Sequence, residues 1–164
     1  MDITINICET HGTNCDGRCI DPNVDNGMMT KVWGPTGWLF LHCITFGYPY
    51  TINLSNPDHA YKKQQYKAFF ESVGDILPCK YCRVSYQDFI KEIPIDNYLR
   101  SRKDICKWLY IIHNKVNQKL GVTENIPSFE ETQQFYEQFR AKCKKTTGYE
   151  NKKISEKGCV NPAD

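Results

Sequence analysis

Apolar residues recur at spacings of three and four in five segments of this 164-residue chain. That spacing predicts amphipathic helices, and no segment shows the strict alternation of a half-buried strand. The expected helices cover about 35–46, 57–77, 79–93, 101–120 and 128–143. Short amphipathic helices joined by short loops predict an all-α bundle.

Local signals support several of these helix ends. Pro35 suits the first turn of a helix, and Gly121 suits a C-terminal stop. Serines start the last two helices, and an acidic residue follows each serine three positions later, as in a capping box. These two pairs are Ser101 with Asp104 and Ser128 with Glu131.

The expected organisation has four parts. Residues 1–28 form a cysteine-containing flexible arm, 29–121 the main helical domain, 122–148 an additional helix, and 149–164 a polar tail. The net charge is only +2, which gives no electrostatic case for nucleic acid. No apolar run approaches the roughly 20 residues of a membrane span, and the first residues lack the features of a secretory signal.

Nine cysteines are the unusual feature of the composition. Cys79 and Cys82 form a CxxC motif at an expected helix start, where the N-terminus stabilises a thiolate. Helical phase places Cys82 on the apolar face and Cys79 nearer the surface, which suits a redox pair. The alternative is half of a zinc site. Its other ligands would come from the N-terminal arm, at Cys8, His11, Cys15 and Cys19. Cys43 and Cys106, inside helices, are expected to be buried.

Polar and aromatic residues also cluster on the first and fourth expected helices. Trp38 and His42 stand four residues apart, so their rings can meet. On the fourth helix, His113 and its neighbours adjoin the apolar stripe. Each cluster alone is simply explained as core packing, but together they suit a pocket for a flat aromatic cofactor. The clusters are Trp33, Gly34, Trp38 and His42, and His113, Asn114 and Asn117.

The motifs WGPTGWLFLH, YP, PCKYC and WLYIIHNKVNQKLG, in this order over about residues 30–121, resemble the Erv/ALR family of FAD-linked sulfhydryl oxidases. The resemblance implies a four-helix bundle that holds FAD, with a short additional C-terminal helix. It also implies that Cys79 receives electrons from outside, while Cys82 lies against the isoalloxazine ring as a thiolate–flavin adduct or charge-transfer pair. The implied cofactor-binding residues are Trp33, Gly34, Trp38, His42, Tyr48, His113, Asn114, Val116, Asn117 and Leu120.

The implied reaction passes electrons from protein dithiols, or from a thioredoxin-like relay protein, through Cys79–Cys82 to FAD and then to O2, which gives H2O2. No metal is expected. By the same resemblance, Cys15 and Cys19 are candidates for a shuttle disulfide, and a structural or intermolecular disulfide in the arm is equally compatible with the sequence. A homodimer is expected. The location is the host cytoplasm or virion if the chain is viral, and otherwise the mitochondrial intermembrane space.

Two departures from the family pattern change these expectations. Tyr110 and Pro127 occupy the positions of a second disulfide that many members have, so that disulfide should be absent. Pro35 replaces a basic residue, which leaves Lys31 and Lys119 as candidate phosphate contacts. Two other functions remain open: a non-catalytic helical zinc-binding or interaction module, and an oxidase relative that binds FAD but only scaffolds partners.

Overall fold

A computed structural model describes residues 27–140 of the chain. The described elements are α-helices and one short 3-10 helix, η1, and β-structure is limited there to two isolated bridges. The expected all-α class is therefore confirmed. The elements are α1 (Thr30–Phe46), α2 (Pro57–Ile76), α3 (Lys80–Glu92), η1 (Ile95–Tyr98), α4 (Arg102–Lys119) and α5 (Phe129–Glu137).

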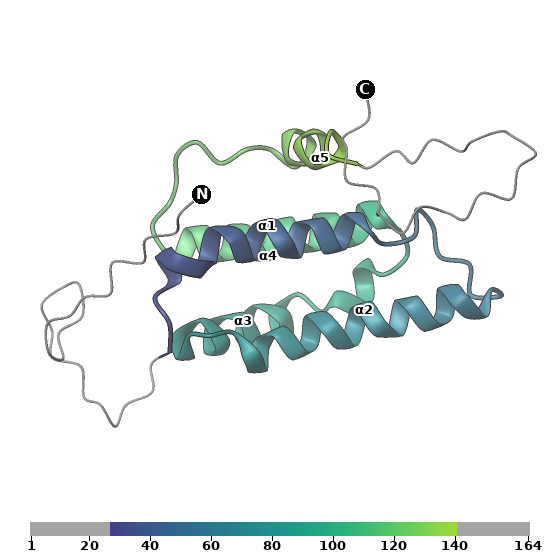
Figure 1. Cartoon of the computed structure of the whole chain (residues 1–164), viewed down its shortest axis with the longest axis horizontal. Helices are drawn as coiled ribbons and strands as arrows, with labels where there is room; N and C mark the ends of the chain where they lie inside the picture. Colours follow the sequence, from purple (N-terminus) through teal and green to yellow (C-terminus); the bar gives the residue numbers. More distant parts are fainter. Residues whose placement is uncertain (1–26, 141–164) are drawn as a thin grey trace, which may run out of the picture.

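The helices form two layers, with α5 on the outside (Figure 1). Helices α1 and α4 lie side by side, and α2 and α3 form the layer beneath them. Helix α5 packs on α1 and α4, on the side away from α2. The N-termini of α1 and α3 and the C-terminus of α4 lie at one end of the bundle.

The core lies between the two layers and is built mainly by α4. Ile105, Trp108, Leu109 and Ile112 have no exposed surface, as the apolar stripe predicts. The Trp108 indole N–H donates to the Ile93 carbonyl at 2.9 Å, so its one polar atom is satisfied. The prediction was wrong for the last residues of the stripe, which are not buried within the described part of the chain. Val116 is half-buried and Leu120 is 70% exposed.

Two helix bounds differ from expectation. Helix α1 begins at Thr30, so Pro35 lies inside the helix rather than at its start. The Trp33 indole N–H donates to the Met28 carbonyl at 3.2 Å, a contact that supports this early start. Helix α5 ends at Glu137, and the backbone hydrogen bonds of Phe139 and Arg140 span three residues, as in a tightened final turn. Phe139 therefore lies beyond the helix and is exposed.

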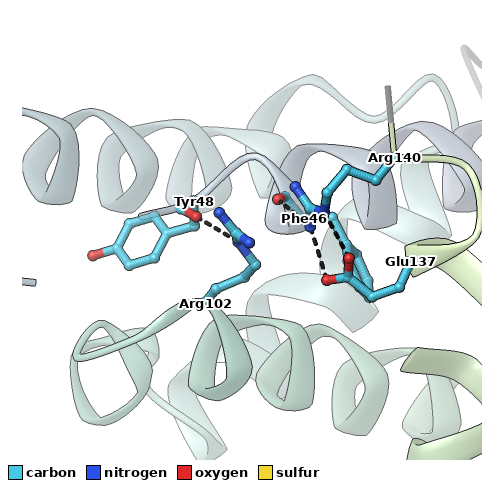
Figure 2. Close-up of polar contacts among 5 residues, drawn as sticks. All are labelled: Phe46, Tyr48, Arg102, Glu137 and Arg140. Atoms are coloured by element: carbon cyan, nitrogen blue, oxygen red, sulfur yellow. Dashed lines mark hydrogen bonds and ion pairs between the residues drawn. The ribbon is translucent and has the colours of Figure 1, made fainter. Parts of the chain in front are cut away.

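Arginine side chains fix the end of α1 to α4 and α5 (Figure 2). Arg140 donates to the Phe46 carbonyl at 3.3 Å and is held by Glu137, with an Nε–Oε2 distance of 2.6 Å. The Nε of Arg102, the first residue of α4, donates to the Tyr48 carbonyl at 2.7 Å. The last carbonyls of a helix lack intrahelical partners. These arginines supply donors at and just after the end of α1, so Arg102 connects this end to α4 and Arg140 connects it to α5.

Helix starts follow their local sequence. Ser128 and Glu131 form the expected capping box of α5. At α4, the Ser101 hydroxyl accepts from the amide of Asp104 at 3.2 Å. At α2, the side chain of Asn56 caps the helix, and Pro57 stands in the first turn.

Candidate active site

Cys79 and Cys82 lie together at the start of α3. Cys79 is the N-cap residue, and its sulfur accepts from the amide N–H of Cys82 at 3.3 Å. Both side chains are partly exposed, and neither forms a disulfide in this structure. The first N–H groups of a helix lack intrahelical partners, and the Cys79 sulfur supplies one of these partners. The arrangement is that of a reduced dithiol in which one sulfur caps the helix.

The Cys82 thiol is less accessible to solvent than a free thiol. Burial raises the pKa of Cys82 above its ordinary value, and the nearby Cys79 adds to this rise. The positive charges of Lys119 and Arg83 act in the opposite direction. The Arg83 guanidinium also donates to the Leu77 carbonyl at 2.7 Å, where α2 ends.

The segment that leads into α1 pairs with the redox motif. Gly27 and Cys79 form an isolated antiparallel bridge, and the Met28 amide donates to the Pro78 carbonyl at 2.5 Å. Gly27 has a φ of +78°, and a Cβ built there would lie 2.1 Å from the Pro78 oxygen. Only glycine fits this position. The backbone before α1 therefore crosses directly beside Cys79.

Three rings meet between α1 and α4. The Trp38 and His113 rings stack with centroids 3.9 Å apart and an interplanar angle of 9°. His42 Nε2 and His113 Nδ1 are 3.2 Å apart, a hydrogen-bond distance. Burial lowers the pKa of His42 to about 3 and that of His113 to about 4. Both imidazoles are therefore neutral near pH 7, and one donates to the other.

A cavity of about 500 Å³ opens beside these histidines. That volume is in the range of small-molecule binding sites. Its lining combines aromatic rings, amides and imidazoles from α4, α5 and the loop between them. The lining residues are His42, Tyr110, His113, Asn114, Asn117, Ile126, Pro127, Glu131, Thr132, Phe135 and Tyr136.

The cavity fits the neutral, flat part of a flavin dinucleotide. His42 Nδ1 is buried and has no hydrogen-bond partner among the described residues, whereas buried polar atoms normally have one. Asn117 donates to Asn114 at 3.3 Å, which leaves further amide atoms of both residues for a ligand. The lining residues include Glu131 and no lysine or arginine, so this cavity does not supply a cation for a pyrophosphate group.

The structure brings together part of the predicted cofactor set. His42, His113, Asn114 and Asn117 line the cavity, and Trp38 stacks on His113. Gly34 faces open space, because a Cβ there would meet nothing within 4 Å. Trp33, Val116 and Leu120 do not line the cavity.

Tyr48 lies in the core rather than at the cavity. It has no exposed surface, and its hydroxyl donates to the Leu99 carbonyl at 2.9 Å. Its ring meets that of Tyr66 edge-on. Helix packing thus accounts for the position of Tyr48, and its expected contact with the cofactor stays a prediction.

Sequence reasoning missed the contribution of α5. Phe135 and Tyr136 line the cavity, and the Tyr136 ring lies 4.9 Å from that of His42. The signal was the aromatic run that follows the Ser128–Glu131 capping box, which we interpreted only as an apolar stripe. That stripe faces a cavity as well as the bundle.

A hydrogen bond joins the two positions where a second disulfide was expected to be absent. The Tyr110 hydroxyl donates to the Pro127 carbonyl at 3.0 Å. The Tyr110 ring also packs edge-on against Phe129, at the start of α5. These contacts connect α4 to the segment before α5 without sulfur.

The remaining cysteines divide between the described and the undescribed parts of the chain. Cys106 is buried, as expected, but Cys43 is exposed on α1, so the expectation of burial was wrong for Cys43. The candidate shuttle residues Cys15 and Cys19, and the zinc alternative with Cys8 and His11, lie outside the described residues. Within residues 27–140, no group of three or more candidate ligands could hold a metal ion. No helix in that range is long and apolar enough to cross a membrane.

The structure is thus a small helical bundle that carries a dithiol at a helix start and a ligand cavity lined by neutral histidines. The sequence profile of the Erv1/Alr family matches residues 35–140. The chain therefore belongs to the Erv1/Alr family.

Relatives and a solved structure agree with this assignment. One relative is a protein of Acanthamoeba polyphaga mimivirus named "Probable FAD-linked sulfhydryl oxidase". It is 40% identical to this chain over 95 residues, which cover 57% of this chain and 62% of the relative. The mitochondrial FAD-linked sulfhydryl oxidase ERV1 of Saccharomyces cerevisiae is 30% identical over 87 residues, which cover 53% and 42%. The crystal structure of the FAD binding domain of Erv1 from that yeast superposes with a TM-score of 0.55 at 25% identity, over 67% of this chain and 91% of that domain. The chain thus spans less than two thirds of either of these curated relatives.

Proposed function

We propose that this protein is an FAD-dependent sulfhydryl oxidase that forms disulfide bonds in protein substrates. The observation that carries the proposal is the Cys79–Cys82 dithiol at the start of α3, in a chain of the Erv1/Alr family. The names of the relatives support the reaction class, and the cavity beside the neutral His42 supports the cofactor.

The two cysteines divide the thiol chemistry between them. One thiolate of the substrate attacks Cys79 Sγ of the oxidised pair, which forms a mixed disulfide and releases Cys82 as a thiolate. The second substrate thiolate then attacks the first substrate sulfur in that mixed disulfide. The substrate disulfide forms, the bond to Cys79 breaks and Cys79 leaves as a thiolate, so the substrate is oxidised by two electrons. FAD, when bound, accepts this electron pair and passes it to O2, which yields H2O2. The Cys82 amide donates to the Cys79 sulfur and so holds it at the start of α3.

The cofactor-holding residues we propose fall into two groups. Trp38, His42, His113, Asn114 and Asn117 supply the stacked rings and polar atoms of the cavity. Trp33, Gly34, Val116 and Leu120 lie outside it and remain proposals from the family resemblance. Gly34 leaves room for a ligand to approach α1 closely.

We also propose partners that follow from this function. The substrates are protein dithiols or a thioredoxin-like relay protein. A homodimer through α1 is supported by exposed Val32, Leu39 and Phe40. Light scattering should show a dimer that Phe40→Glu converts to a monomer. A monomer in the unmodified chain contradicts the proposal.

The shuttle and the location are further proposals that experiments can separate. Replacing both Cys15 and Cys19 with Ser should slow the oxidation of a protein dithiol but spare dithiothreitol. Equal rates for both substrates contradict the shuttle. Viral and mitochondrial relatives are both known. We propose the host cytoplasm or virion, and cell fractionation with a mitochondrial marker tests this against the intermembrane space.

Oxygen consumption with dithiothreitol tests the proposed function. Cys79→Ser and Cys82→Ser should each abolish turnover, while the matched control Cys43→Ser, on exposed α1 surface, should retain it. If the protein binds flavin but neither Cys79→Ser nor Cys82→Ser changes turnover, the redox centre is not this dithiol. Bound zinc without flavin would indicate the interaction module instead.

A further inference from the structure

Lys119 brings a positive charge to the first turns of α3. It stands in the last turn of α4, and its ammonium group donates to the hydroxyl of Ser85. Ser85 is nearly buried, and its own hydroxyl donates to the Tyr81 carbonyl at 2.8 Å. The lone pairs of that hydroxyl therefore face the lysine. Two hydrogen bonds in series hold the ammonium against α3.

Lys119 stands at the C-terminal end of α4, which favours a cation, and its ammonium group also lies against the first turns of α3. The N-terminal end of a helix carries partial positive charge, so it attracts anions and repels cations. Lys115, Lys67 and Arg140 each pair with a carboxylate, but Lys119 forms no ion pair among residues 27–140. Its partner there is an uncharged hydroxyl. The cation and the helix N-terminus thus converge on one place without a fixed anion.

Cys82 is the group on α3 that can supply this anion. It precedes Ser85 by three positions, and residues at that spacing are neighbours on a helix surface, about 5–6 Å apart at Cβ. The charge of Lys119 lowers the pKa of Cys82 and so opposes the effect of burial. Arg83 acts in the same direction, but its guanidinium is engaged with the Leu77 carbonyl.

We propose that Lys119, held by Ser85, is a positioning residue that stabilises the thiolate of Cys82 when the dithiol is reduced. The role of that thiolate in turnover rests on the proposed oxidase function. The electrostatic effect is a property of this chain and can be measured without turnover. It also gives Lys119 a function other than the phosphate contact that the sequence suggested.

The alkylation rate of Cys82 tests the proposal directly. The full chain with Cys79→Ser is treated with iodoacetamide at a fixed mildly alkaline pH, and mass spectrometry follows the modification of Cys82. Adding Lys119→Met removes a unit positive charge near a partly solvated thiol and should raise the Cys82 pKa by roughly one unit. The thiolate fraction then falls about tenfold, and the higher intrinsic nucleophilicity recovers part of this loss, so alkylation slows about threefold.

Controls on the same helix give the test its specificity. Lys115→Met removes a lysine one turn earlier that pairs with Glu92 at 2.5 Å, and it should leave the Cys82 rate unchanged. Ser85→Ala releases the ammonium and should slow alkylation by less than Lys119→Met. High salt should shrink the Lys119 effect, because exposed charges are screened.

Three results would overturn the proposal: an unchanged rate in Lys119→Met, an equal slowing in Lys119→Met and Lys115→Met, or an effect insensitive to salt. The proposed function fails on a different observation, namely the absence of flavin-dependent oxygen consumption. A failure of either one is therefore recognised separately.

Discussion

The buried histidines predict a fall in stability between pH 7.5 and pH 5. The folded chain holds the pKa of His42 at about 3 and that of His113 at about 4. In the unfolded chain a histidine titrates near 6.5. The unfolded state therefore binds more protons over this range, and the free energy of unfolding decreases as the pH falls.

The magnitude follows from proton linkage. A histidine that titrates at 6.5 in the unfolded chain and stays neutral in the folded chain lowers the free energy of unfolding by about 2 kcal/mol between pH 7.5 and pH 5. His42 is 2% exposed and should contribute close to this amount. His113 is partly open to solvent and should contribute less, so we expect a total of about 3 kcal/mol. Glu131 and Glu137 have lowered pKa values and titrate below this window.

Urea unfolding followed by circular dichroism at pH 7.5, 6 and 5 measures the effect, with and without added FAD. His42→Phe removes one titrating group while keeping a ring against Tyr136, so its pH dependence should shrink to about 1 kcal/mol. The control His59→Gln removes a histidine that does not line the cavity and should keep the full dependence. A constant stability in this window, or an undiminished slope in His42→Phe, would refute the reasoning.

Three further substitutions test individual contacts. Gly27→Ala forces a Cβ into the Pro78 carbonyl, so it should lower the free energy of unfolding by at least about 1 kcal/mol. It should also speed hydrogen exchange of the Met28 amide, which donates to that carbonyl, and unchanged exchange contradicts the bridge. Tyr110→Phe removes a hydrogen bond to the loop before α5 and should lower the free energy of unfolding by about 1 kcal/mol, seen as a lower Tm. The control Tyr61→Phe, at an exposed residue, should leave the Tm unchanged, and equal Tm values for the two variants contradict the prediction. Arg140→Gln frees α5 from the last carbonyl of α1 and should weaken FAD binding severalfold in a fluorescence titration; an unchanged Kd would show that α5 is fixed by other contacts.

The helices could be predicted where local pattern and burial agree. Ser128 caps α5 as its sequence indicates, and Trp108 is buried as its stripe indicates. The start of α1 was missed because Gly34 and Pro35 suggest a break in a helix. A helix at Thr30 is supported by contacts such as that of Trp33 with Met28, which spacing does not reveal.

The candidate site could be predicted only where its residues are close in sequence. Cys79 and Cys82 lie within one helical turn, so their motif was sufficient. The contact between His42 and His113 joins residues 71 positions apart, and periodicity cannot specify it. Tyr136 enters the site because α5 folds over α1 and α4, which depends on packing after the helices have formed.

The visible absorption spectrum of the purified full chain tests the central claim most directly. The account predicts a flavin spectrum that bleaches when dithiothreitol is added and recovers as dissolved oxygen is consumed, and Cys82→Ser should prevent the bleaching. A colourless protein that takes up no added FAD would contradict the account, because the cavity beside His42 and His113 would then not be a flavin site.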